Sequence, residues 1–227
     1  MFFRRVPFSA IPNARDVGGY PTKDGKVMKT GQFYRSGIPF AVSADDEKLF
    51  ERLNVKNVVD LRNEEERLRE VDATQFVKGL RRVVFETGGQ MPLCKQEVPP
   101  LYVELMKLPN KRDLFAFFAE CQGAVLFHCT AGKDRTGTVA AILQMLAGVD
   151  DADIVADYVV TYAYFYPRIR QFIARNPQMD PEVGIPEPEH MFDFLKLFRE
   201  EFGSAENYLA QIGLTAEQIA KLKSKVV

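Results

Sequence analysis

Apolar residues along this chain fall into short uninterrupted runs and into longer stretches with helical spacing. The runs at residues 55–61, 79–85 and 124–127 have the length and apolar content of buried strands. Residues 62–70, which follow the first run, are densely charged and predict a solvated helix or loop. Residues 87–100 contain paired Gly and paired Pro, so we expect a loop there that borders a cleft.

Helical patterns alternate with these runs. Ser43 and Asp46 form a capping-box pattern, which predicts a helix ahead of the first strand. Further helices are predicted over residues 111–121 and 138–147, the latter ending at Gly148. This alternation predicts an α/β fold, with a central, mostly parallel sheet flanked by helices and a ligand beyond the carboxyl ends of the strands.

Residues 150–202 form the largest segment outside this alternation. Two helical patterns, at residues 153–166 and 187–202, are separated by a proline-rich break. We interpret the segment as a helical, lid-like cover over the ligand site, not as a second domain. The chain, residues 1–227, is therefore predicted to be a single domain.

The composition limits which kinds of partner and which cellular compartment we expect. The net charge of −1 gives no overall basic bias, so nucleic acid is not expected as a partner. No stretch approaches the roughly 20 apolar residues of a membrane-spanning helix. Three cysteines in 227 residues do not suggest a disulfide framework, and a reactive thiol fits a reducing compartment. We expect a cytoplasmic location, with export as a secreted effector left open.

Ten consecutive residues after the third apolar run carry the clearest chemical signal. They are His-Cys-Thr-Ala-Gly-Lys-Asp-Arg-Thr-Gly at positions 128–137. Between a strand and a helix, the N–H groups of residues 130–135 would surround an anion at the positive end of the helix dipole. Gly132 supplies backbone freedom that a side chain would obstruct. The arrangement favours a phosphate group as ligand.

Cys129 and Arg135 stand at the mouth of this loop. A helix N-terminus and neighbouring cations favour the thiolate of Cys129, which would then be a nucleophile. The Arg135 guanidinium can hold two phosphoryl oxygens while charge redistributes in the transition state. The Thr136 hydroxyl is expected to donate to the sulfur and ease departure of the thiolate when a phospho-cysteine is hydrolysed.

These residues resemble the Cys-based protein tyrosine phosphatases, whose signature is His-Cys, five residues, Arg and then Ser or Thr. The chain is more closely similar to the bacterial atypical tyrosine phosphatase family, in which Lys-Asp precedes the Arg and which includes enzymes acting on phosphoinositides. Further blocks match in order at residues 13–20, 34–36, 58–62, 208–209 and 212–215. The resemblance implies a tyrosine-phosphatase-like fold and a phosphatase activity with no metal or other cofactor.

The leaving oxygen of a phosphate ester must be protonated by a carboxyl group within hydrogen-bond distance. We predict that Asp134 is this general acid. Its alternative role is an ion pair with Lys133 or another base. Asp60, at the end of a predicted strand, is the second candidate, and its alternative role is an ion pair with Arg62.

Five loop residues are expected to contact the substrate: Thr130, Ala131, Gly132, Lys133 and Gly137. By resemblance to phosphoinositide phosphatases, Lys133 would contact a second phosphate on an inositol ring, and a solvated lysine is the alternative. His128 is expected to orient the loop from behind. Arg62, like Arg15 and Arg35, either supports the site or ties loops together. Two histidines and no paired cysteine spacing argue against a zinc site.

Together these features predict a phosphatase that hydrolyses phosphotyrosine, phosphoinositide monoesters or both through a phospho-Cys129 intermediate. The partner would be a phosphotyrosine protein or a phosphoinositide, with transient contact to a membrane surface. Two alternatives come from other classes. One is a rhodanese-like sulfurtransferase, which also uses a cysteine in an anion-binding loop, and the other is a phosphate-binding module without turnover.

Overall fold

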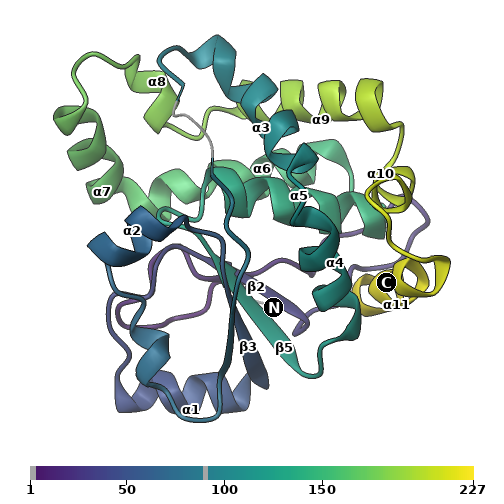
Figure 1. The fold of residues 1–227 in the computed structure, drawn as a ribbon, viewed down its shortest axis with the longest axis horizontal. Coiled ribbons are helices and arrows are strands. Elements are labelled where there is room, and N and C mark those ends of the chain that lie inside the picture. Colours follow the sequence, from purple (N-terminus) through teal and green to yellow (C-terminus); the bar gives the residue numbers. More distant parts are fainter. Residues whose placement is uncertain (1–3, 89–91) are drawn as a thin grey trace.

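A computed structural model describes residues 4–88 and 92–227, and within them the chain forms a five-stranded sheet (Figure 1). The order is β1-β2-β5-β3-β4, with β1 antiparallel to β2 and the other neighbours parallel. This confirms the predicted α/β fold with a mostly parallel sheet. The strands are β1 (Arg15–Asp16), β2 (Phe33–Ser36), β3 (Val55–Asp60), β4 (Arg81–Val84) and β5 (Ala124–His128).

Helices lie on both sides of the sheet (Figure 1). The α-helices are α1 (Ala44–Arg52), α2 (Glu64–Arg69), α3 (Val98–Lys107), α4 (Lys111–Glu120), α5 (Asp134–Ala147), α6 (Asp151–Val159), α7 (Thr161–Arg175), α8 (Pro181–Gly184), α9 (Pro188–Phe202), α10 (Ala205–Gln211) and α11 (Ala216–Val226). The 3₁₀ helices are η1 (Ala73–Phe76) and η2 (Lys95–Glu97). The capping box that begins α1 and the left-handed Gly148 that ends α5 are both present, as predicted.

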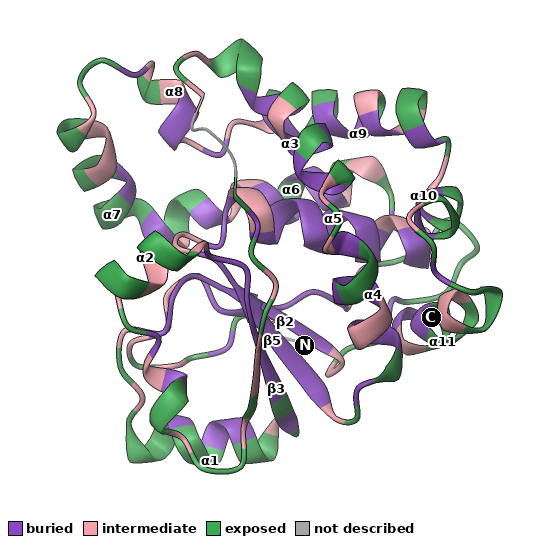
Figure 2. Cartoon of the chain, viewed as in Figure 1, coloured by how far each residue is buried: buried purple, intermediate pink, exposed green. Residues whose placement is uncertain are grey.

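Two apolar cores lie on opposite faces of the sheet. Along β5, Val125 and Phe127 belong to the larger core, while Ala124 and Leu126 belong to the smaller core beneath α1. This alternation follows from the two-residue period of a strand. Figure 2 shows the central strands as mostly buried, with exposed residues on the outer faces of the helices. The carboxyl end of β5 is therefore held rigidly from both sides.

Two predicted boundaries were wrong. The single helix expected over 153–166 is interrupted at Val160, between α6 and α7, within a run of three β-branched residues that weakens helical preference. In the loop expected over 87–100, the prolines lie in the first turn of α3, a position that proline favours; residues 89–91 of that loop lie outside the described residues. Residues 62–70 contain α2, which has no buried residue, in agreement with the predicted solvated helix or loop; its Glu66 is partly exposed.

The segment predicted as a helical cover divides into two parts. Helices α6 and α9 contribute Tyr158, Phe194 and Phe198 to the larger core, so they are integral to the fold. Helices α7 and α8 extend beyond the sheet, on the side where α2 lies (Figure 1). Their covering role, and the assignment of one domain to residues 1–227, stay predictions. Within the described residues, no helix has both the length and the apolar character needed to cross a membrane.

A buried ion cluster joins the N-terminal segment to α6. Asp157 of α6 is fully buried and accepts bonds from Arg4, Arg15 and Arg35 at 2.8, 3.0 and 2.6 Å. Burial acts to raise the pKa of Asp157, but the charges of the three arginines lower it below its usual range. The carboxylate is thus the common partner of three cations that would otherwise repel one another.

Replacing Asp157 with Asn should leave its buried arginine partners without a counter-charge. We expect the free energy of unfolding to fall by about 3–5 kcal/mol, measured by urea denaturation. The control is Asp151→Asn, which removes a partly exposed pair with Arg199 and should cost at most about 1 kcal/mol. Similar losses in both variants would contradict the central role of Asp157.

Candidate active site

The loop between β5 and α5 places Cys129 at the carboxyl end of the central strand. The residue is only 2% exposed, and the N–H of Gly132 donates to its sulfur at 3.3 Å. Because α5 begins at Asp134, the positive end of that helix lies at the same loop. The N–H group and the helix N-terminus both stabilise negative charge at this position.

The curvature of the loop requires glycine at position 132. Gly132 has a φ of 69°, a conformation that L side chains rarely adopt. A Cβ atom there would lie 2.3 Å from the carbonyl oxygen of Ser36 and 2.7 Å from the backbone nitrogen of Gly37. The loop therefore packs directly against the backbone that follows β2, with no room for a side chain.

The carbonyl groups of the loop are held by the N-terminal third of the chain. Asn13 Nδ2 donates to the Ala131 oxygen at 3.0 Å, and Arg35 Nη2 donates to the Gly132 oxygen at 2.7 Å. The N–H of Ile38 donates to the carbonyl oxygen of the preceding loop residue, Thr130, at 3.0 Å. With their carbonyls bound on this side, the peptide groups are free to direct their N–H groups toward an anion on the sulfur side.

Arg135 is paired with Glu66, a residue that the sequence-based predictions missed. Its Nη1 and Nη2 donate to the two carboxylate oxygens at 2.5 and 2.6 Å, and Nη1 also donates to the Thr87 carbonyl at 3.3 Å. A guanidinium has five N–H groups. Those left are the Nε–H and the second Nη2–H, which has only a 3.5 Å contact to Thr130 Oγ1. Together they form a fork suited to two phosphoryl oxygens.

Glu66 connects three parts of the site. It completes the capping box of α2 with Asn63, it binds Arg135, and it accepts a hydrogen bond from the Thr130 hydroxyl at 2.7 Å. Burial acts to raise its pKa, but the bonds and charge of Arg135 lower the pKa of Glu66 to about 2. A spacing of three from the capping residue was the one available signal for Glu66.

Lys111, at the start of α4, is a second residue that the sequence did not single out. It is fully buried, and its ammonium donates to Thr87 Oγ1 at 2.7 Å. Burial, together with the nearby charge of Arg135, lowers the pKa of Lys111 to about 7. Thr87 thus bridges the two cations, with its hydroxyl on Lys111 and its carbonyl on Arg135.

Asp134, the predicted general acid, lies in the first turn of α5 with its side chain 38% exposed. Its Oδ1 is 3.2 Å from the Lys133 ammonium, so the alternative ion pair is present, and the same oxygen accepts a bond from the Tyr102 hydroxyl at 2.5 Å. Lys133 is itself 4% exposed and also donates to the Val183 carbonyl of α8. It is therefore not a solvated lysine.

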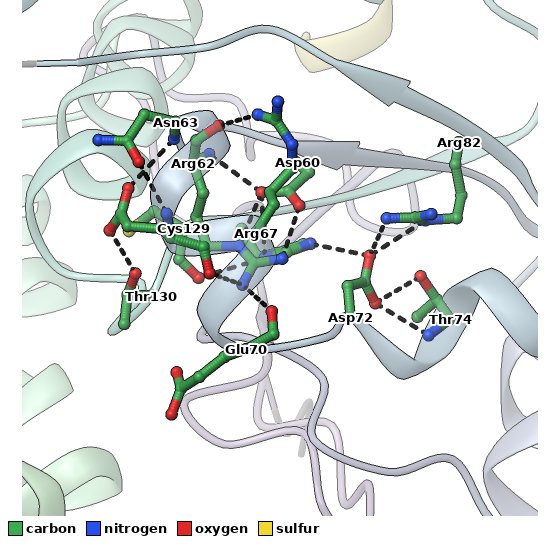
Figure 3. A network of polar contacts seen from close by, with 12 residues as sticks. Asp60, Arg62, Asn63, Arg67, Glu70, Asp72, Thr74, Arg82, Cys129 and Thr130 are labelled. Carbon is green, nitrogen blue, oxygen red and sulfur yellow. Dashed lines mark hydrogen bonds and ion pairs between the residues drawn. The ribbon is translucent and has the colours of Figure 1, made fainter.

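Asp60, the second candidate acid, is held by Arg62. The guanidinium donates to both carboxylate oxygens, at 3.0 and 2.8 Å, and both residues are buried (Figure 3). This ion pair is the alternative, structural role that the sequence analysis gave for both Asp60 and Arg62. His128 lies beside them, 0% exposed, with Nε2 3.3 Å from Asp72 and Nδ1 3.2 Å from the Cys129 carbonyl oxygen. Its placement behind the loop fits the predicted orienting role.

Asp60, Asp72 and His128 offer ligand atoms within 4.8 Å of one another, a spacing that a metal ion could use. Arg62 binds both oxygens of Asp60, while Arg82 and Thr74 bind those of Asp72 (Figure 3). The cluster therefore already has its charge partners within the protein.

Thr136 and Gly137 follow the arginine as buried residues of α5. The Thr136 hydroxyl has no hydrogen-bond partner among residues 4–88 and 92–227, so the expected donation to the Cys129 sulfur is not formed in this structure. A Cβ on Gly137 would lie 3.2 Å from the Tyr158 ring and 3.3 Å from Arg35 Nη2. Gly137 thus allows close packing of α5 against the residues that hold the loop.

The three cysteines are all free thiols. Cys121 precedes β5, whereas Cys129 follows it, so the length of a five-residue strand, roughly 16 Å, separates them. That separation excludes a direct disulfide between this pair without a large rearrangement.

A buried thiol, a strand-to-helix loop curved around it and an arginine thus lie together at the C-terminal edge of an α/β sheet. Residues 6–227 match the profile described as the tyrosine phosphatase family, and the chain belongs to that family. The chain is 35% identical over 168 residues to a putative tyrosine-protein phosphatase of Cupriavidus necator, covering 68% of this chain and 62% of the relative. It is 34% identical over 134 residues to a tyrosine-protein phosphatase of Nostoc commune, covering 52% and 44%.

The chain therefore spans less than two thirds of the length of these relatives.

Among solved structures, P. aeruginosa TpbA is 22% identical with a TM-score of 0.35, over 68% of this chain and 84% of that one. The catalytic core of the PP-IP phosphatase SIW14 from S. cerevisiae is 18% identical with a TM-score of 0.39, over 70% and 95%. TM-scores of this size carry no weight for function.

Replacing Glu66 with Gln should loosen the orientation of Arg135, because an amide accepts from only one of the two guanidinium nitrogens. We expect the affinity for tungstate, measured by titration calorimetry, to fall by about 10-fold or more. The matched control is Glu65→Gln, which alters an exposed neighbour paired with Arg69. Equal affinities in the two variants would show that Arg135 is oriented without Glu66.

Replacing Lys111 with Met should change the pH dependence of stability. The folded-state pKa of about 7 lies below the usual 10.5, so between these values the unfolded chain binds a proton that the folded chain lacks. The native protein therefore gains stability through this group as pH rises. We therefore expect the difference in free energy of unfolding, Lys111→Met minus native, to fall by on the order of 1–3 kcal/mol from about pH 6 to about pH 9.

Urea denaturation across this range measures the difference. Lys78→Met, at an exposed position, is the control and should differ from the native protein by a constant amount. A constant difference for Lys111→Met as well would contradict the lowered pKa of Lys111.

Proposed function

We propose that this protein is a Cys-dependent phosphatase that hydrolyses phosphate monoesters through a phospho-Cys129 intermediate. The observation that carries the proposal is the free fork of Arg135 beside the curved loop that surrounds the Cys129 sulfur. The loop N–H groups and the guanidinium supply donors for the phosphoryl oxygens, whose charge is greatest as the bond to the leaving group breaks. Family membership supports the same reaction class.

In the first step, the Cys129 thiolate attacks phosphorus. The S–P bond forms while the bond from phosphorus to the leaving oxygen breaks, and the acid form of Asp134 gives its proton to that oxygen. Asp134 is favoured over Asp60 because both oxygens of Asp60 are bound by Arg62, whereas Asp134 is at the loop and partly exposed.

In the second step, water attacks the phospho-cysteine and the S–P bond breaks. The Asp134 carboxylate accepts a proton from the water, and the thiolate is restored. The Thr136 hydroxyl supports this step in the proposal because it is buried one residue after Arg135 and has no partner in the described part of the chain. It is therefore available to donate to the departing sulfur.

The two alternatives have less support. A rhodanese-like sulfurtransferase would not account for a family match over residues 6–227. A binding module without turnover would not require the partly exposed carboxyl group of Asp134, which precedes Arg135 in the chain. The phosphatase proposal uses all of these groups.

The proposed substrates are phosphotyrosine, phosphoinositides or both. A relative in Mycobacterium tuberculosis, 29% identical over 117 residues, is named a triple specificity protein phosphatase, which supports a broad substrate range. For Lys133 to reach a second phosphate on an inositol ring, its bond to the Val183 carbonyl of α8 must open. The remaining loop contacts predicted for Thr130, Ala131, Gly132 and Gly137 belong to the same proposal.

Compartment and membrane contact belong to the proposal as well. The three free cysteines support work in the reducing cytoplasm, with export left open. Transient contact with a membrane surface would accompany a phosphoinositide substrate. On α7, the exposed Arg170 and Arg175 are available for it, whereas Arg168 stacks on Phe40 at 3.6 Å.

Phosphate release should be measured with EDTA present from a phosphotyrosine peptide and from vesicles containing phosphoinositides. We expect Cys129→Ser to lower release by more than about 1,000-fold on every active substrate, because the nucleophile is lost. Cys94→Ser is the control and should retain native turnover. Release from only the peptide or only the vesicles would identify the substrate class.

No release from the native protein with any substrate would contradict the proposed phosphatase. If phosphotyrosine then still bound with the same affinity as tungstate, the binding module would be favoured.

A further inference from the structure

A chain of three hydroxyl and carboxyl groups runs from the core to the loop. Tyr102 of α3 and Tyr158 of α6 are both 0% exposed, and their hydroxyl oxygens are 2.7 Å apart. The Tyr102 hydroxyl is also 2.5 Å from Asp134 Oδ1. Three helices thus converge on one carboxyl group, and the two tyrosines have no catalytic part in the steps described above.

The direction of the hydrogen bonds follows from chemistry. An ionised carboxylate only accepts, so the Tyr102 hydroxyl donates to Asp134. Its proton is then used, so the Tyr158 hydroxyl donates to the Tyr102 oxygen. Burial raises the pKa of both tyrosines well above the usual value, so both keep their protons.

The two oxygens of Asp134 therefore differ. Oδ1 accepts from Tyr102 and is also 3.2 Å from the Lys133 ammonium. Oδ2 has no hydrogen bond or ion pair within residues 4–88 and 92–227. Because two donors already point at Oδ1, a proton on the carboxyl group is favoured on Oδ2.

Neighbouring aromatic rings hold the side chain of Tyr102 in place. The Tyr102 ring packs edge-on against the rings of Tyr158 and Phe194, with centroids 6.2 and 5.8 Å away. Rigid support of this kind holds a reacting group within the narrow range of positions that proton transfer needs.

We propose that Tyr102 is a positioning residue for the general acid, holding Asp134 by Oδ1 so that its proton is carried on Oδ2 toward the leaving oxygen. This inference rests on the proposed phosphatase function. In the step concerned, the Oδ2–H bond breaks, its proton joins the leaving oxygen as the P–O bond breaks, and the S–P bond to Cys129 forms. Asp134 is left as a carboxylate that Tyr102 continues to hold.

The test compares kcat for phenyl phosphate with kcat for 4-nitrophenyl phosphate. Phenolate is the poorer leaving group, so its departure depends more on the acid. Tyr102→Phe should lower kcat by about 10-fold or more on phenyl phosphate and by less than about 3-fold on 4-nitrophenyl phosphate, with KM little changed. A merely structural loss would affect the two substrates equally.

Tyr208→Phe is the matched control, because it removes a buried hydroxyl bonded to the Met106 carbonyl in the same core. It should leave the ratio of the two kcat values as in the native protein. On an Asp134→Asn background, Tyr102→Phe should cause no further selective loss on phenyl phosphate, since the acid through which it acts is gone.

An equal loss on both substrates, or a selective loss that persists without Asp134, would overturn the proposal while leaving the phosphatase function intact.

Tyr158→Phe gives a second test should Tyr102→Phe fail to fold. It should cause a smaller selective loss, because the Tyr102 hydroxyl loses the donor that polarises it; an unchanged ratio there would overturn the proposal. If native release does not depend on Cys129, the proposed function fails first and this inference falls with it.

Discussion

The binding of the loop carbonyls by the N-terminal segment is the constraint on which the site depends. A loop of this length surrounds an anion only if its peptide groups turn their N–H groups toward one point. Asn13, Arg35 and the Ile38 N–H bind the carbonyl oxygens of three successive residues. Gly132 permits the loop to pack against the backbone after β2. The proposed anion site is therefore preorganised by residues that need not touch the anion.

Charge balance accounts for much of the remaining architecture. The fold buries several arginines close to the loop, and each has a carboxylate partner: Asp157 holds Arg15 and Arg35, while Glu66 holds Arg135. An unpaired buried charge would cost several kcal/mol, on the order given for broken buried pairs. Pairing also restricts orientation, because the N–H groups of Arg135 that donate to Glu66 cannot also serve a substrate. What is left is a fork on one side of the guanidinium.

The sequence determined the local elements around the site. A short apolar run, a Gly-containing loop and a helical pattern ending in Gly148 were enough to predict β5, the anion-binding loop and α5. These features depend on neighbouring residues and on backbone preference, which are legible along the chain. The helix break at Val160 was missed because local apolar spacing continues across it.

Tertiary structure decided which distant groups meet at that loop. In the charged stretch 62–70, only the capping-box spacing from Asn63 distinguishes Glu66 from its exposed neighbour Glu65, and that spacing does not indicate the contact with Arg135. Tyr102 reaches Asp134 only because α3 packs beside α5 and α6. Such contacts join residues tens of positions apart, and they are set by core packing and by the pairing of buried charges. The sequence by itself was enough to predict Cys129 and its loop as the candidate site, and only the fold selected the partners that orient them.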